Sequence, residues 1–201
     1  MDNRNRIIEG AAELFRSYGI KTVTMDSLAS HLGISKRTIY EVFSDKDELL
    51  MGVFKLMAEK QKELVKKVLD DSDNAIVAIF TLLRISRDHF QNMSPAFQAD
   101  MKRFHQIFLT NKNDKFEMPD YKNNQQLFER GIKEKLFRND INPDLVNRCF
   151  DSLGRSIMNN DLYPFDQFSR HDVIGNVLIN YLRGISTTQG QELINRLEHK
   201  F

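Results

Sequence analysis

Apolar residues recur at helical spacing along almost the whole chain, and this periodicity constrains the fold more than any other feature. In the first segment they lie three and four residues apart, on one face of a helix: Ile7, Ile8, Ala11, Ala12, Leu14, Phe15 and Tyr18. No segment alternates apolar and polar residues for long enough to form a strand. The sequence therefore predicts an all-α protein of about nine or ten helices.

Residues that begin or end helices stand between these segments. Gly19 and Gly33 are expected to end the first two helices, because glycine readily adopts a left-handed conformation. Thr24 and Ser35 can cap the second and third helices. Capping boxes are expected at the start of three later helices: Ser44 with Asp47, Ser169 with Asp172, and Thr188 with Gln191.

Composition limits the partners that the chain can bind. Its 201 residues contain 29 Lys and Arg against 28 Asp and Glu, a formal net charge of +1, so any basic surface must be local. Residues 1–50 carry seven basic and eight acidic side chains, which predicts modest affinity for DNA of arbitrary sequence. A hydrophobic content of 41% is sufficient for a folded core.

The sequence lacks the signals that are typical of several other classes of protein. The single cysteine, Cys149, excludes an internal disulfide framework, and its apolar surroundings predict a buried thiol. The five histidines form no metal-binding pair, so no metal or other cofactor is expected. No phosphate-binding glycine loop or nucleophile elbow occurs, and we expect no enzymatic activity. The longest nearly apolar run, 75–83, is too short to span a membrane, and no signal peptide precedes it, which predicts a cytoplasmic protein.

The segment from Thr24 to Phe43 has the pattern of a helix-turn-helix. Two short helical segments are joined by the turn 32–35, and the second could enter a DNA major groove. Ile39 and Phe43 are expected to point inward as anchors. The outward face would then carry Ser35, Lys36, Arg37, Thr38, Tyr40 and Glu41.

Three of these outward side chains can read base edges. Arg37 could bind guanine O6 and N7 through its planar guanidinium, and Lys36 could do so less specifically. Glu41 could accept a hydrogen bond from cytosine N4. Its negative charge is expected to weaken general DNA affinity and to sharpen sequence choice.

Hydroxyl groups and one further lysine are candidates for phosphate contacts. Ser35, Thr38 and Tyr40 offer hydroxyls suited to phosphate oxygens. Lys46 lies at the start of the long helix expected to run towards Leu69, where free backbone N–H groups also attract a phosphate.

The helix caps, the turn glycine and the buried anchors of the N-terminal quarter all match the sequence signature of one known family. The matching residues are Ile8, Ala11, Ala12, Leu14, Phe15, Gly19, Thr22, Thr24, Leu28, Ala29, Gly33, Ile34, Ser35, Thr38, Ile39, Tyr40, Phe43, Lys46 and Leu49. On these residues the chain resembles the TetR (tetracycline-repressor) family of transcriptional regulators.

The resemblance implies an all-helical homodimer that binds double-stranded DNA at a palindromic operator. Residues 1–48 would form the helix-turn-helix head, and residues 49–201 a helical domain for ligand binding and dimerisation. Family members are most often repressors that a small-molecule effector controls. Family roles imply backbone contacts by Thr24, Ser35, Thr38, Tyr40 and Lys46, and base contacts by Lys36 and Arg37. Val42 departs from the family pattern, which puts one phosphate contact in doubt.

Aromatic residues are concentrated in the central part of the chain, where eight of the 15 phenylalanines lie between residues 80 and 137. Most should be core residues, but polar side chains interrupt their stripes, as the wall of a ligand cavity requires. The candidate ligand-binding residues are Phe80, Arg87, Met101, Phe104, His105, Phe108, Tyr121, Gln125 and Phe128. These walls favour a small, largely apolar effector, and Arg87 or His105 would suit an acidic group on it.

Residues 173–185 carry more apolar side chains than one core-facing stripe requires. The excess predicts a second burial partner, which a two-fold four-helix interface between two copies would supply. The candidate interface residues are Phe150, Gly154, Ile157, Met158, Val173, Val177 and Tyr181.

Three functions from different classes remain open at this point. The sequence favours a ligand-responsive DNA-binding regulator. The alternative is a helical protein-interaction module without operator binding, and a third possibility is a helical enzyme. A mobility shift on palindromic DNA separates the first two, and the lack of nucleophile–base spacing argues against the third.

Overall fold

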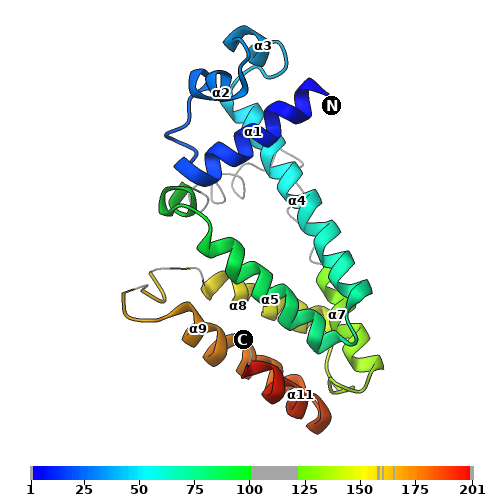
Figure 1. Cartoon of the computed structure of the whole chain (residues 1–201). Helices are drawn as coiled ribbons and strands as arrows, with labels where there is room; N and C mark the ends of the chain where they lie inside the picture. Colours follow the sequence, from blue (N-terminus) through cyan, green and yellow to red (C-terminus); the bar gives the residue numbers. More distant parts are fainter. Residues whose placement is uncertain (1, 101–121, 158, 160, 165, 200–201) are drawn as a thin grey trace. The chain divides into compact units, whose positions relative to one another are not determined.

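The computed structural model describes residues 2–100, 122–157, 159, 161–164 and 166–199, which are predominantly helical (Figure 1). The α-helices are α1 (Asn3–Tyr18), α2 (Met25–Leu32), α3 (Lys36–Tyr40), α4 (Lys46–Asp71), α5 (Ala75–Gln91), α7 (Lys122–Lys133), α8 (Pro143–Ile157), α9 (Arg170–Val173), α10 (Asn180–Ile185) and α11 (Thr188–Glu198). In the described ranges, extended pairing is limited to an isolated antiparallel bridge between Phe137 and Ser186. The predicted all-α fold is confirmed.

The chain divides into two compact units. Unit 1 contains the residues up to Gln61 and, of the described residues, 87–100; unit 2 contains Lys62–Ser86 and the described residues from 122 onward. α4 contributes to both units. Unit 1 therefore extends beyond the expected head of residues 1–48, because its core also buries side chains from α4 and from residues 93–97.

The core of unit 1 joins the first three helices to more distant parts of the chain. Phe15 of α1, Leu28 of α2 and Ile39 of α3 are all 1% exposed or less. Phe97 belongs to the same buried cluster, although it lies far away in the sequence. Apolar side chains from remote segments thus stabilise one core, in which each fully buried large residue contributes about 1.5–3 kcal/mol.

Side-chain caps begin several helices, and some differ from the expected residues. Ser169 accepts a hydrogen bond from the Asp172 backbone N–H at 3.0 Å, as expected at α9. At α4 the cap is Asp45 and not Ser44: Asp45 Oδ1 accepts from the Glu48 N–H at 2.8 Å. The Glu48 carboxylate accepts from the Ser44 N–H at 2.8 Å, so Ser44 contributes its backbone to the helix start, while the side-chain cap lies one residue later than predicted.

The start of α11 is also displaced by one residue. Thr187, and not Thr188, accepts a hydrogen bond from the Gly190 N–H at 3.2 Å. The Thr187 hydroxyl also donates to the Lys135 carbonyl at 2.8 Å. This contact with a distant loop explains the choice of cap, because it orders Thr187 outside the helix.

Unit 2 has a separate apolar core with clustered aromatic rings. Phe128 lies 5.7 Å from Phe137 and 5.6 Å from Phe150, measured between ring centroids.

A π-helical segment, Ile174–Ile179, joins α9 to α10. The apolar residues of this joined helix that are buried within the chain itself are Val173, Ile174, Leu178, Ile179, Leu182 and Ile185. Their own chain therefore accounts for much of the apolar excess from which the dimer was predicted.

Cys149 on α8 is exposed, and the prediction of a buried thiol is wrong. The sequence placed Cys149 on the apolar stripe of this helix. In the structure, Val146 and Ile157 of α8 are buried and Phe150 is partly buried, while Cys149 is turned towards solvent. The burial of a residue at the edge of a stripe depends on the neighbouring helices, which the spacing of one helix does not specify.

Candidate DNA-binding site

The two short helices of unit 1 are closed by the expected caps and turn. Thr24 accepts a hydrogen bond from the Ser27 N–H at 3.1 Å, and the Thr24 N–H donates to the Ser27 hydroxyl at 2.9 Å, which completes a capping box at α2. Gly33 ends α2 in the left-handed conformation with φ 64°. Ser35 then caps α3 by accepting from the Thr38 N–H at 3.1 Å. The predicted helix-turn-helix is present.

Two buried anchors orient the outward face of α3. Ile39 and Phe43 are both 0% exposed. Lys36 and Arg37 lie on the exposed side, and Tyr40 is 46% exposed. Burial of the two anchors thus presents the predicted reading residues to solvent, where a DNA groove could receive them.

The hydroxyl groups expected to contact phosphate also have local roles. The Ser35 and Thr38 hydroxyl oxygens lie 2.9 Å apart, and the Thr24 hydroxyl belongs to the α2 cap. The positions of Ser35 and Thr24 are exposed, while Thr38 is partly buried. These side chains hold the ends of the helices, and their contacts with DNA stay a prediction.

Both basic residues on the reading face have acidic partners. Lys36 Nζ donates to Asp26 Oδ2 at 2.8 Å and joins α3 to α2. This hydrogen bond raises the pKa of Lys36 above its ordinary value. Arg37 Nε donates to Glu41 Oε1 at 3.1 Å, although 89% of the Arg37 side chain is exposed. Such exposed pairs contribute little to stability and can exchange for DNA groups.

Lys46 lies where it was expected, at the start of α4, but its ammonium group points to a different target. Its Nζ donates to the carbonyl oxygens of Ile20 and Val23, both at 2.5 Å. Burial lowers the pKa of Lys46, while the carboxylates of Asp100 and Asp47 oppose this shift. In this arrangement the ammonium holds the loop between α1 and α2, and its contact with a DNA phosphate stays a prediction.

Comparison with known proteins points to the same part of the chain. The family described as "Bacterial regulatory proteins, tetR family" matches residues 7–53. The HTH-type transcriptional regulator YvaF of Bacillus subtilis is 25% identical over 187 residues, which cover 92% of this chain and 96% of YvaF. The regulator YhgD of the same organism is 29% identical over 93 residues, and this alignment spans 44% of the chain and about half, 49%, of YhgD.

A solved structure shares the fold along nearly the whole chain. The crystal structure of a gamma-butyrolactone receptor (ArpA like protein) matches with a TM-score of 0.66 at 18% identity. The match covers 98% of this chain and 97% of the receptor. An all-α fold with a capped helix-turn-helix and an exposed second helix is typical of helix-turn-helix DNA-binding proteins.

The chain matches the TetR family of bacterial regulatory proteins over residues 7–53 and is similar to the regulator YvaF over most of its length. It is a DNA-binding transcriptional regulator and not an enzyme. Among the described residues, no helix has both the length and the apolar character needed to cross a membrane.

The predicted ligand-binding residues are only partly within the described ranges. Met101, Phe104, His105, Phe108 and Tyr121 lie outside the described residues. Of the remaining four, two are core residues of unit 2: Phe80 is 6% exposed and Phe128 is 1% exposed. The other two have acidic partners, since Arg87 pairs with Asp88 at 3.0 Å and Gln125 donates to Glu129 at 2.7 Å. The predicted cavity stays a prediction.

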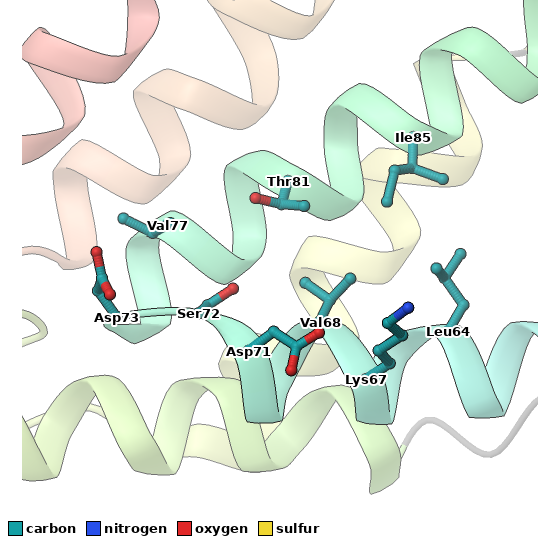
Figure 2. A pocket seen from close by; sticks show the side chains of 9 residues that line it. All are labelled: Leu64, Lys67, Val68, Asp71, Ser72, Asp73, Val77, Thr81 and Ile85. Carbon is teal, nitrogen blue, oxygen red and sulfur yellow. The ribbon is translucent and has the colours of Figure 1, made fainter.

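A pocket of about 380 Å³ lies elsewhere in unit 2, between the second half of α4 and the part of α5 up to Ile85. Figure 2 shows its side chains on both helices and on the connecting loop. Its lining residues are Leu64, Lys67, Val68, Asp71, Ser72, Asp73, Val77, Thr81 and Ile85. Apolar walls with a few charged groups suit a small amphipathic molecule. Sequence reasoning missed this pocket because its residues belong to two ordinary amphipathic stripes.

The predicted dimer residues lie on α8 and on the helix that contains the π segment. Ile157 and Val173 are 1% and 4% exposed within their own chain. Phe150, Val177 and Tyr181 are partly buried, and the rings of Phe150 and Tyr181 lie 6.4 Å apart. Gly154 is also partly buried, and Met158 lies outside the described residues. The interface stays a prediction.

Proposed function

We propose that the protein is a repressor that binds a palindromic operator as a homodimer and is released by a small, largely apolar ligand. DNA binding is proposed from the exposure of Arg37 on α3. Its side chain is 89% exposed, while the anchors Ile39 and Phe43 are buried in the core. A long exposed guanidinium on a rigid helix suits bidentate recognition of guanine.

Asp26 and Glu41 bear on the specificity of this helix. Because they pair with Lys36 and Arg37, DNA must replace both acidic partners when it binds. A base edge that offers good acceptors can compensate for this loss, whereas a poorly matched sequence leaves Glu41 near the DNA without a donor. The pairs therefore favour sequence-selective binding over strong general affinity.

Selection of DNA duplexes from a random-sequence pool tests whether the protein prefers a palindromic operator. We expect the wild-type protein to select an inverted repeat, since a two-fold dimer presents two identical heads. Arg37→Ala should cost about 1–3 kcal/mol on the selected duplex and relax the preference at one base of each half-site. Binding affinity and base preference are measured on the same duplex set. A selected sequence without inverted symmetry would contradict dimeric binding.

Lys46→Ala, measured in the same experiment, is compared with Arg37→Ala. Because its ammonium holds the loop between α1 and α2, the substitution should weaken binding to all sequences alike. The dependence of affinity on salt should change little, whereas loss of a phosphate contact would reduce the slope by about 0.9. Equal base profiles for the Arg37 and Lys46 variants, or a salt slope reduced by about 0.9 in Lys46→Ala, would contradict this division of roles.

The pocket between α4 and α5 supports the ligand-binding part of the proposal. Its walls include Leu64, Val68, Val77 and Ile85. Of its charged groups, Lys67 could bind an acidic group, and Asp71 and Asp73 could bind a basic one. The related fold of the gamma-butyrolactone receptor supports a small-molecule ligand by analogy. A ligand can change operator affinity only by its preference between two conformations, typically about 1–3 kcal/mol.

A thermal-shift screen of hydrophobic carboxylates and hydrophobic cations identifies the ligand class, and operator titration then tests release. We expect carboxylates to stabilise the protein and to weaken operator binding. Lys67→Gln should remove this response, while Lys66→Gln, an exposed α4 lysine outside the pocket lining, should preserve it. Stabilisation by cations alone would refute the acidic ligand, and a bound ligand without effect on operator affinity would refute the switch.

A further inference from the structure

Residues 93–100 are distant in sequence from the DNA-binding head but belong to unit 1. The Ser94 N–H donates to the Arg16 carbonyl at 3.1 Å, which attaches the segment to the end of α1. Phe97 is 1% exposed in the same apolar core as α1, α2 and α3. The head is therefore completed by a segment that follows α5 in the chain.

Asp100 is the buried charged residue of this segment. It is 6% exposed, and its Oδ2 accepts a hydrogen bond from the Lys21 backbone N–H at 3.0 Å. Its Oδ1 lies 3.8 Å from Lys21 Nζ. A buried carboxylate that accepts from a backbone N–H forms a charge-assisted hydrogen bond, which is stronger than a bond between neutral groups.

The backbone beside Lys21 fits this contact closely. Gly19 ends α1 with φ 86°, a conformation that glycine adopts readily. A Cβ atom at Gly19 would lie 2.8 Å from Ala96 Cβ and 3.2 Å from Asp100 Oδ2. The close approach of the two segments therefore requires glycine at this position.

Two side chains from other segments, Asp100 and Lys46, hold the loop between α1 and α2 by hydrogen bonds to its backbone. Asp100 binds the Lys21 N–H, and Lys46 binds the carbonyl oxygens of Ile20 and Val23. Val23 directly precedes Thr24, the cap of α2. Because α2 packs against α3, the position of this loop influences the position of the reading helix.

We propose that Asp100 is a positioning residue for DNA binding, which acts through the loop between α1 and α2 without touching DNA. Its carboxylate fixes the loop, the loop and Lys46 fix the start of α2, and α2 supports α3. This inference rests on the DNA-binding function of the head. It assigns a role in operator affinity to a residue outside the helix-turn-helix.

The test compares two carboxylates that each accept a remote backbone N–H. Glu134 in unit 2 is the matched control, since its Oε2 accepts from the Ala75 N–H at 2.8 Å. Wild type, Asp100→Ala, Asp100→Asn and Glu134→Ala are assayed on the duplex that wild type selects from a random pool, and hydrogen exchange is measured across residues 19–25 and 75–80.

We expect Asp100→Ala to weaken duplex binding about tenfold with an unchanged base preference, and to speed exchange in residues 19–25 only. Asp100→Asn should lie between this variant and wild type, because its amide oxygen can still accept from Lys21 but carries no charge. Glu134→Ala should speed exchange in residues 75–80 and leave affinity within about twofold of wild type.

Wild-type affinity in Asp100→Ala, or an equal loss in Asp100→Ala and Glu134→Ala, would overturn the proposal. If Asp100→Ala does not fold, Asp100→Asn is compared with Glu134→Gln on the same criteria. If wild type selects no preferred duplex, operator recognition fails as a function. Affinity for mixed-sequence DNA and exchange in residues 19–25 then decide the role of Asp100 separately.

Discussion

Phe43→Ala should destabilise unit 1 by about 3–5 kcal/mol and reduce operator affinity at least tenfold. Phe43 is 0% exposed and lies just beyond α3, which ends at Tyr40, so its ring anchors the end of this helix in the core. The Arg4 guanidinium also lies 4.6 Å from the centre of this ring and would lose its aromatic partner. Urea unfolding and duplex titration measure the two effects.

Phe168→Ala is the matched control, because it removes the same side chain from a position that is 46% exposed. We expect it to change the free energy of unfolding by less than about 1 kcal/mol and to leave duplex affinity unchanged. If Phe43→Ala were no more destabilising than this control, the inward anchor of the reading helix would be wrongly assigned.

Gly190→Ala should destabilise unit 2 by about 2–3 kcal/mol. A Cβ at Gly190 would lie 2.1 Å from the Leu136 carbonyl oxygen and 3.0 Å from Ser186 Cβ. The carbonyl belongs to the backbone and accepts from the Thr187 N–H at 3.0 Å, so it cannot move without loss of that hydrogen bond. Thermal unfolding should therefore show a lower melting temperature.

The same change at Gly184 should have the opposite sign. Gly184 lies in α10 and is exposed, and a Cβ atom there would have open space around it to 4 Å among the described residues. Alanine at this position should stabilise the helix by about 0.5–1 kcal/mol, since it restricts the unfolded chain. A Gly190→Ala protein as stable as Gly184→Ala would contradict the close contact between α11 and the segment around Leu136.

The fold class and the reading helix could be predicted because their signals are local. Gly33 and Ser35 lie next to the helix ends that they determine, and Ile39 and Phe43 lie one turn apart. Such short-range geometry follows from backbone conformation and the helical repeat alone. Even here the sequence placed two caps one residue away, since Asp45 and Thr187 compete with equally suitable neighbours.

The hydrogen-bond partners of Lys46 and Asp100 could not be predicted from local sequence signals. The ammonium group of Lys46 binds carbonyl oxygens 23 and 26 residues away in the chain, and the sequence analysis named neither partner. Asp100 binds a backbone N–H across 79 residues, and no motif in the sequence points to it. A flexible lysine or a lone aspartate has no periodic signal, because its partner depends on which remote segment packs beside it.

The sequence by itself determined that this chain is helical, that it carries a capped helix-turn-helix, and that Arg37 lies on the exposed face of the second helix. Only the tertiary structure decided that Phe97 completes the core of the head, that Cys149 is exposed and that Asp100 is buried against the loop at Lys21. The physical reason is the range of the interactions. Helix caps and periodicity act within about one turn of helix, whereas burial depends on contacts between segments far apart in the chain.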